Sequence, residues 1–586
     1  MRSHQRIVGL CLLLALLAPA AGAEDLPNRP ELLTVSQQVG QPGGILVVAL
    51  RAEPRTLNPF FAVDNPSLTV IRRLMADLIH IDRQSLDTVP ALASRWQTSP
   101  DGRFITVELR RGIRFSDGHP LDVDDVLFTF EALLDPRTAA PQRGLLEVDG
   151  KPISVEKLDE HRVRFDLKAP YAVGDRLFDS VPVLPRHRLE PAYREGRLNE
   201  VWSLSTPPEE IVGLGPFRLA RYVPGERLEL TRNPHYWKRD SAGQRLPYLE
   251  RLVFLFVANA DAQALRFRAG EAHLTDRLGA RNFAVLETHL SRQPKDRPPY
   301  LLRDLGRGPD YNFLFFNLNP LPEASDSALA VKQKWFRELA FRRAVSLAID
   351  RDSLVRLVYQ GRANPLITHV PPGYGEWAHD SLQSPPRSVE QARQRLRQAG
   401  FTLDAGELRD ADGQRVEFSI LTSASNRERS EIATLIQSDL SELGMRVQVV
   451  PMEFRALVDR VLRQHAYEAC ILGLGGGDVD PNSAIPMLTS DGPNHFWQLV
   501  KPSTLPPWQI EIDRLMALQF GTVDPHERQR LYYRVQELVA ENLPMIFLVS
   551  PNVLTGAAAG LGNFRPATLD HFTLWNVEEL YWRQRP

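Results

Sequence analysis

The chain has 586 residues and a mass of 66.2 kDa, a length that typically divides into several domains with separate cores. Its 70 Lys and Arg residues nearly balance its 72 Asp and Glu residues, so the charge excludes a nucleic-acid footprint and a polyanionic tail. With 43% hydrophobic and 24% charged residues, the composition excludes a mainly disordered chain. The 46 prolines indicate many extended connections, which is typical of a loop-rich α/β protein.

The N-terminal segment has the pattern of a secretory signal peptide. Basic residues precede the apolar run over residues 7–18, and small residues follow it as far as Ala23. The alternative, a membrane anchor, is disfavoured because Pro19 interrupts the run before it reaches the roughly 20 residues that cross a membrane. We therefore expect cleavage after Ala23 and an exported protein. Only Cys470 then remains, which excludes an intramolecular disulfide.

Strand-like and helical runs alternate along the rest of the chain. Strands are predicted over 45–50, 104–109, 162–167, 251–257, 312–318, 415–421, 446–450 and 545–549. Helices with recognisable start or stop signals are predicted over 123–134, 335–349, 388–399, 427–443 and 525–542. Residues 90–235 are rich in hairpin signals, whereas the pattern from about 306 to 550 predicts a helix-covered, mostly parallel sheet. This difference between the two parts of the chain predicts two lobes of different structure.

The sequence carries none of the short motifs that accompany common catalytic chemistry. There is no Gly-x-Ser-x-Gly elbow, no His-Glu-x-x-His pair, no Gly-Lys-Ser/Thr phosphate loop and no Cys-x-x-Cys pair. The glycine-rich run 473–477 is followed by Asp478, Asp480 and Pro481, and the proline disfavours a dinucleotide-binding turn. The acidic cluster 122–125 is interpreted as a helix N-cap and not as a metal site. We therefore predict no enzyme activity, no cofactor and no metal.

A series of short segments follows the order of one known family. They are TLNP at 56–59, PALASRW at 90–96, LRRGIRFSDGHP at 109–120, DDV at 124–126, GLGPF at 213–217, NPHYW at 233–237, RAVSLAIDR at 343–351 and IQSDL at 436–440. This series resembles the family 5 extracellular solute-binding proteins, which are the peptide-binding components of ABC importers. The resemblance covers the mature chain, with Leu214 standing where the family often has threonine.

The resemblance implies a fold and a domain organisation. It implies an α/β, two-lobed periplasmic-binding-protein clamshell of type II, in the large form with an extra domain in the first lobe. Residues 24–60, 200–305 and 550–586 would form the first lobe, 61–199 its extra domain and 306–549 the second lobe. The crossings near 306 and 549 would act as a hinge, and closure would bury a ligand between the lobes.

The resemblance also implies where a ligand would bind. In peptide-binding members, an acidic residue in a second-lobe loop pairs with the ligand's α-amino group. The corresponding loop is 473–482, where either Asp478 or Asp480 could take this role beside glycines that let a ligand approach closely. The alternative is that each carboxylate only bonds its own turn. The other candidate ligand-binding residues are Asn494, Trp497, Phe61 and Asp64. Trp497 and Phe61 fit a hydrophobic core equally well.

We therefore predict a monomer that captures short peptides in the periplasm and delivers them to an inner-membrane ABC permease with its ATPase subunits. Extended peptides would be held largely through their backbones. One alternative is a non-peptide cargo, namely a nickel complex, haem, an opine or an oligosaccharide. A metal complex would need a histidine in the cleft, for which His495 is the nearest candidate, and a sugar would need aromatic platforms. A second alternative is a secreted enzyme or sensor on the same fold.

Overall fold

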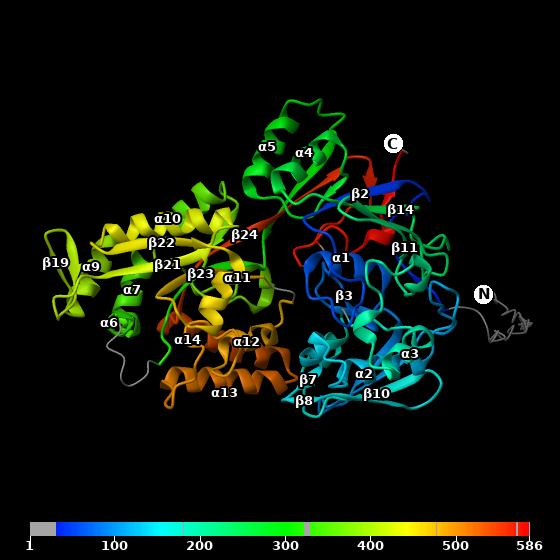
Figure 1. Ribbon diagram of the computed structural model, residues 1–586, viewed down its shortest axis with the longest axis horizontal. Helices are drawn as coiled ribbons and strands as arrows, with labels where there is room; N and C mark the ends of the chain where they lie inside the picture. The colour runs from blue at the N-terminus through cyan, green and yellow to red at the C-terminus, as the bar shows by residue number, and fades with distance from the viewer. Residues whose placement is uncertain (1–30, 180, 321–327, 476–477, 570–571, 585–586) are drawn as a thin grey trace, which may run out of the picture.

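The computed structural model describes residues 31–179, 181–320, 328–475, 478–569 and 572–584. The predicted signal peptide and its cleavage site lie outside these residues. Within the described ranges, none of the helices has the length and apolar character required to cross a membrane. Helices and strands mix throughout two bodies that lie side by side in Figure 1, which confirms the predicted α/β class.

A sheet of 12 strands runs through both bodies. In order its strands are β11 (Phe217–Val223), β12 (Arg227–Arg232), β14 (Arg251–Phe256), β2 (Ile45–Leu50), β15 (Leu274–Thr275), β24 (Met545–Ala558), β17 (Tyr311–Phe316), β23 (Ala469–Leu474), β21 (Glu417–Ser423) and β22 (Arg446–Met452), and β16 (Tyr300–Arg307) and β18 (Ala363–Pro365) pair with β24 off this path. The 14-residue strand β24 pairs with β15 and β16 at one end and with β17 and β18 at the other. It therefore connects the two bodies (Figure 1).

The prediction of a mostly parallel sheet in the second half of the chain was wrong. Strand β21 is parallel to β22 and β23, but β17 is antiparallel to both β23 and β24, and β18 is antiparallel to β24. The reason is topological: β17 brings the chain into the second body and β24 takes it back out, so these neighbouring strands run in opposite directions.

The two bodies have separate hydrophobic cores. We call the body that contains β2, β11, β12 and β14 the first lobe, and the body that contains β17, β21, β22 and β23 the second lobe. Large side chains buried in the first core include Phe60, Phe115, Phe130 and Phe165, and those in the second include Phe313, Phe316, Phe336 and Phe341. Two cores joined by one long strand make the two-lobed architecture that was predicted. The predicted lobe boundaries stay a prediction.

The hairpin-rich part of the first lobe contains an antiparallel sheet. Its order is β5 (Ala93–Thr98), β6 (Phe104–Leu109), β10 (Arg162–Asp166) and β9 (Ser154–Lys157). Helix α2 (Val123–Leu134) begins where predicted, because the Asp122 carboxylate accepts hydrogen bonds from the backbone N–H groups of Asp124 and Asp125 at 2.9 and 3.1 Å. The acidic cluster is therefore a helix cap, as the sequence indicated.

The helices of the second lobe mostly follow their predicted signals. Their bounds are α6 (Ala328–Arg337), α7 (Leu339–Ala348), α9 (Val389–Gln398), α10 (Arg427–Ser441), α13 (Pro507–Gly521) and α14 (Pro525–Asn542). The single helix expected over 335–349 was wrong, since Glu338 has an extended conformation and separates α6 from α7. The buried Arg342 side chain donates hydrogen bonds to the freed carbonyl groups of Phe336 and Arg337 at 2.7 and 2.8 Å, which ends α6.

Candidate functional site

The two lobes touch at a second place, away from β24. The ring of Tyr171, from the hairpin-rich part of the first lobe, stacks on Phe520 near the end of α13, with centroids 4.4 Å apart and planes 9° apart. Beside it, the backbone N–H of Ala172 donates to the Phe520 carbonyl at 3.1 Å. These contacts hold the lobes together on the side where α13 points toward the hairpin-rich part in Figure 1.

Asp478 lies at this same interface between the lobes. Its carboxylate accepts hydrogen bonds from Nε and Nη2 of Arg176 at 2.8 and 2.5 Å, and Arg176 belongs to the 3-10 turn η2 (Gly174–Phe178) of the first lobe. Arg176 also donates from Nη1 to the carbonyl of Leu86 at 2.9 Å. The Asp478 side chain keeps 26% of its surface exposed. The predicted loop therefore supplies an accessible carboxylate to the space between the lobes.

Asp480 has a different environment, entirely inside the second lobe. Its two carboxylate oxygens each lie 3.0 Å from a terminal nitrogen of Arg528 on α14, and both side chains are buried. The carboxylate also accepts the backbone N–H of Asn482 at 3.0 Å and so begins the 3-10 turn η8 (Pro481–Ala484). A ligand ammonium group would have to displace a buried arginine, so these contacts do not favour the predicted ligand role of Asp480.

The glycines before Asp478 make room for side chains of the protein itself. A Cβ atom on Gly473 would lie 2.4 Å from Nη2 of Arg429 and 2.8 Å from Oδ1 of Asn312, and one on Gly475 would lie 2.8 Å from Oδ1 of Asp310. Arg429 donates from Nε to Asn312 Oδ1 at 3.0 Å. At these two positions the glycines leave room for charged and amide side chains of the protein, and their role in ligand approach stays a prediction.

Further charged side chains join the region around residue 277 to the second lobe. Arg277 pairs with Asp310, beside Gly475, and Arg281 on α5 (Ala280–Ser291) pairs with Glu431 on α10 at 2.8 Å. Arg176, Arg277, Asp310 and Arg429 were not predicted from the sequence. They follow no shared motif, and Arg176 and Asp478 are 302 positions apart, so only the folded chain brings them together.

The remaining predicted ligand-binding residues have local or core contacts. Asp64 is the N-cap of α1 (Asn65–Leu74), with its two oxygens accepting the backbone N–H of Ser67 at 3.0 Å and the Ser67 hydroxyl at 2.8 Å. Phe61 is half-buried and packs on the core of the first lobe, while Trp497 is 2% exposed in the core of the second. Asn494 is half-buried, and its backbone N–H donates to the Pro486 carbonyl at 2.9 Å. Ligand contact by these four residues stays a prediction.

His495 is buried and packs against Trp497 with ring centroids 3.9 Å apart. Its Nδ1 lies 3.0 Å from the carbonyl of Met487, and burial lowers the pKa of the imidazole to about 4. A neutral histidine 1% exposed within the second lobe does not favour the metal-complex alternative.

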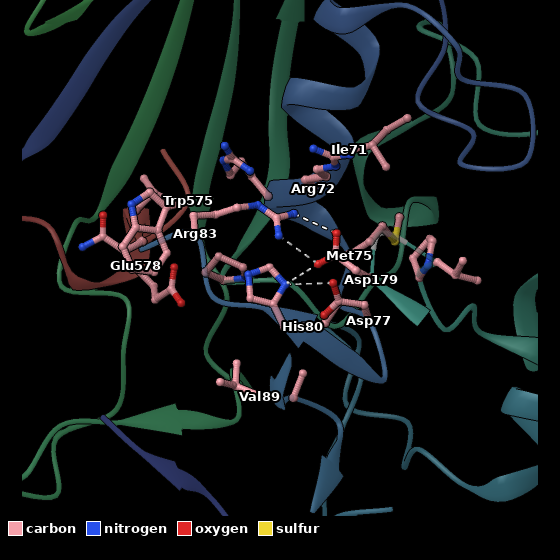
Figure 2. A pocket seen from close by; sticks show the side chains of 18 of the residues that line it. Ile71, Arg72, Met75, Asp77, His80, Arg83, Val89, Asp179, Trp575 and Glu578 are labelled. Atoms are coloured by element: carbon pink, nitrogen blue, oxygen red, sulfur yellow. Dashed lines mark hydrogen bonds and ion pairs between the residues drawn. The ribbon is translucent and has the colours of Figure 1, made fainter. Parts of the chain in front are cut away.

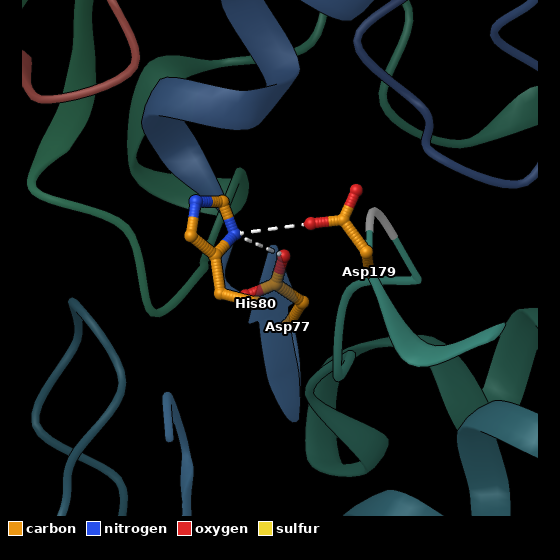
Figure 3. A group of neighbouring side chains, drawn as sticks. All are labelled: Asp77, His80 and Asp179. Carbon is orange, nitrogen blue, oxygen red and sulfur yellow. Dashed lines mark hydrogen bonds and ion pairs between the residues drawn. The ribbon is translucent and has the colours of Figure 1, made fainter. Parts of the chain in front are cut away.

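One group of side chains has the composition of a metal site. The potential ligand atoms of Asp77, His80 and Asp179 lie within 4.8 Å of one another (Figure 3). His80 Nδ1 is 3.0 Å from Asp77 and 3.2 Å from Asp179, and Arg83 pairs with Asp179 at 2.8 Å. Burial alone would lower the pKa of His80, but the two carboxylates raise it to about 9. The cluster is thus a charge-balanced ion-pair network, and a metal ion would place a further positive charge beside Arg83.

Two lobes that share one long strand and meet again around an accessible carboxylate define the class of two-lobed substrate-binding clamshells. The chain belongs to the bacterial extracellular solute-binding proteins, family 5, since the model of the middle part of that family matches residues 87–496. The members of this family are solute-binding proteins.

Individual relatives match over nearly the full chain. A probable ABC transporter-binding protein of Deinococcus radiodurans is 27% identical over 88% of each chain. Di/tripeptide-binding protein 3 of Pseudomonas aeruginosa is 24% identical over 82% of this chain and 84% of its own. The solved structure of the oligopeptide-binding protein AppA from Bacillus subtilis, in complex with a nonapeptide, has a TM-score of 0.72 at 23% identity and covers 93% of this chain and 100% of its own. This likeness confirms the predicted clamshell fold.

Proposed function

We propose that this protein captures short peptides between its two lobes and delivers them to an inner-membrane ABC permease. The observation that carries the proposal is the accessible Asp478 carboxylate at the contact between the lobes, in the loop where the family resemblance expects the amine-binding acid. The similarity to a di/tripeptide-binding protein of Pseudomonas and to an oligopeptide-binding protein of Bacillus supports the proposal.

Asp478 is the better of the two candidate partners for the peptide's ammonium group. Its carboxylate is partly exposed and already binds a cation, the Arg176 guanidinium, whereas the carboxylate of Asp480 is buried in an ion pair with Arg528. A peptide ammonium would share or replace Arg176 when the lobes close around the ligand. Loss of the carboxylate would then leave a desolvated cation unpaired, which costs roughly 3–5 kcal/mol, or a hundredfold or more in affinity.

Calorimetry with free and N-acetylated peptides tests this role. Asp478→Asn should weaken binding of a free peptide by about a hundredfold and should no longer distinguish the free from the acetylated form. Asp491→Asn, an exposed carboxylate in a neighbouring second-lobe loop, is the matched control and should leave affinity unchanged. If Asp478→Asn binds the free peptide within about threefold of the unmodified protein, the assignment is wrong.

The proposed function also requires that the signal peptide is cleaved and that the two lobes move. Cleavage after Ala23 would release a periplasmic monomer without catalytic activity, and bending near residues 306 and 549 would close the lobes. Mass spectrometry of the exported protein checks the cleavage site, and small-angle scattering should show a smaller radius with bound peptide. An unchanged radius at saturating peptide would contradict closure. Release of cleaved peptides in proportion to active protein would contradict the absence of catalysis.

A further inference from the structure

The first lobe contains a cavity of about 750 Å³ that is separate from the contact between the lobes. Its lining comes from within residues 33–37, 59–91, 133–146, 177–179, 181–184 and 216–238, and from residues 565 and 574–579, so among the described residues it receives no side chain from the second lobe. Figure 2 shows one part of it, with His80, Arg83, Trp575 and Glu578 among the side chains drawn. A cavity of this size is within the range of small-molecule sites.

The lining of the cavity combines an apolar surface with charged groups. The apolar side chains include Leu33, Leu68, Ile71, Met75, Val89, Leu145 and Leu574. Four of the cations have carboxylate partners, namely His80 with Asp77 at 3.0 Å, Arg83 with Asp179 at 2.8 Å, Lys238 with Glu578 at 2.7 Å, and Arg565 with Glu579. Within each pair the opposite charges neutralise each other, so the apolar surface of the cavity is free to receive a ligand.

Arg73 is different from these paired cations. It lies in the last turn of α1, lines the cavity and is only 4% exposed. Its Nε and Nη2 atoms are buried and have no hydrogen-bond partner within the described part of the chain. Burial lowers the pKa of the guanidinium to about 10, so the side chain is still charged at neutral pH.

The carboxylates that act on Arg73 from a distance are bound elsewhere. Asp276 accepts hydrogen bonds from the backbone N–H and the hydroxyl of Thr573 at 2.9 and 2.6 Å, and Glu578 is held by Lys238. Within the described residues, Arg73 is therefore a buried charge with no ion-pair partner, an arrangement that destabilises a protein unless something supplies the missing negative charge.

We propose that this cavity is a second binding site, which takes an organic anion with a compact apolar body. The carboxylate of the ligand pairs with the guanidinium of Arg73, and its apolar part contacts the surface around Ile71, Met75 and Leu574. A planar guanidinium suits this partner because it can bind a carboxylate through two parallel hydrogen bonds. A neutral ligand would leave the charge of Arg73 uncompensated, and a cation would repel it.

Calorimetry on the full mature protein tests the site with two pairs of probes, octanoate with octanamide and 4-phenylbutyrate with 4-phenylbutyramide. Each carboxylate should bind at least tenfold more tightly than its amide, because a hydrogen bond to a charged group adds about that much. Arg73→Gln should remove this preference and Arg73→Lys should keep part of it. Arg188→Gln, a partly exposed arginine of the same lobe that pairs with Asp117, is the control and should change nothing.

The comparison of carboxylate and amide on the unmodified protein decides the question even if Arg73→Gln fails to fold. Equal binding of both members of each pair, or no binding of either carboxylate, would overturn the proposal. Peptide affinity measured on the same samples separates this site from the proposed function. Octanoate should bind equally well with and without saturating peptide, so failure of peptide binding leaves the cavity test valid, and competition between the two would show that the cavity is not a separate site.

Discussion

The replacement Asp480→Asn tests whether this residue stabilises the second lobe or binds a ligand. Asp480 and Arg528 are 6% and 3% exposed at the side chain and make two hydrogen bonds of 3.0 Å. The amide of asparagine can still accept the backbone N–H of Asn482, but it removes the charge that neutralises Arg528. Breaking a buried pair on one side costs about 3–5 kcal/mol, so the free energy of unfolding of the second lobe should fall by this amount.

Urea unfolding followed by circular dichroism measures this loss, with Asp478→Asn as the matched control. The Asp478 pair is partly exposed at the lobe interface, so its removal should cost no more than about 1 kcal/mol of stability while it weakens peptide binding. The reasoning fails if Asp480→Asn unfolds within about 1 kcal/mol of the unmodified protein and at the same time loses peptide affinity. That result would return the ligand role to Asp480.

Three further outcomes follow from other contacts. The pKa of His80 is raised from 6.5 to about 9, so the protonated side chain stabilises the first lobe fully below about pH 6.5, and this stabilisation is lost as the pH rises through 9. In calorimetric unfolding, the stability of His80→Gln should therefore depend less on pH between 6.5 and 9 than that of the unmodified protein. Gly473→Ala should cost about 1–3 kcal/mol in urea unfolding because its Cβ would lie 2.8 Å from the backbone carbonyl oxygen of Tyr311, whereas Gly144→Ala, with nothing within 4 Å, should be neutral. Phe520→Ala should remove the stacking across the lobes and give a larger radius in small-angle scattering with bound peptide, and an unchanged radius would show that this contact does not hold the closed lobes together.

Local features of this fold could be predicted from the sequence because their contacts span only a few residues. Asp122 and Asp524 begin α2 and α14 by accepting backbone N–H groups at most three positions away. The direction of β17 could not be predicted in the same way. It depends on β24, which lies more than 200 positions further along the chain, and the alternation of strands and helices does not encode it.

The contacts of the candidate site were also beyond what the sequence could predict, because they join distant parts of the chain. Asp478 and Asp480 are two positions apart in one loop, and both could be proposed as ligand partners from the sequence. Their environments differ because each meets an arginine from a distant part of the chain: Arg176 from the first lobe in one case and Arg528 from α14 in the other. Neither arginine belongs to a motif, so the sequence could identify the loop but not the division of roles within it.

This division of roles suggests how the loop works. The buried pair with Arg528 fixes Asp480 to α14, and Oδ1 of Asp478 accepts the backbone N–H groups of Val479 and Asp480 at 2.7 and 3.3 Å. The position of the accessible carboxylate therefore depends on the buried one, which reduces the ordering that ligand binding would otherwise require. It follows that a change at Asp480 can weaken peptide binding only together with a loss of stability, whereas a change at Asp478 can weaken binding alone.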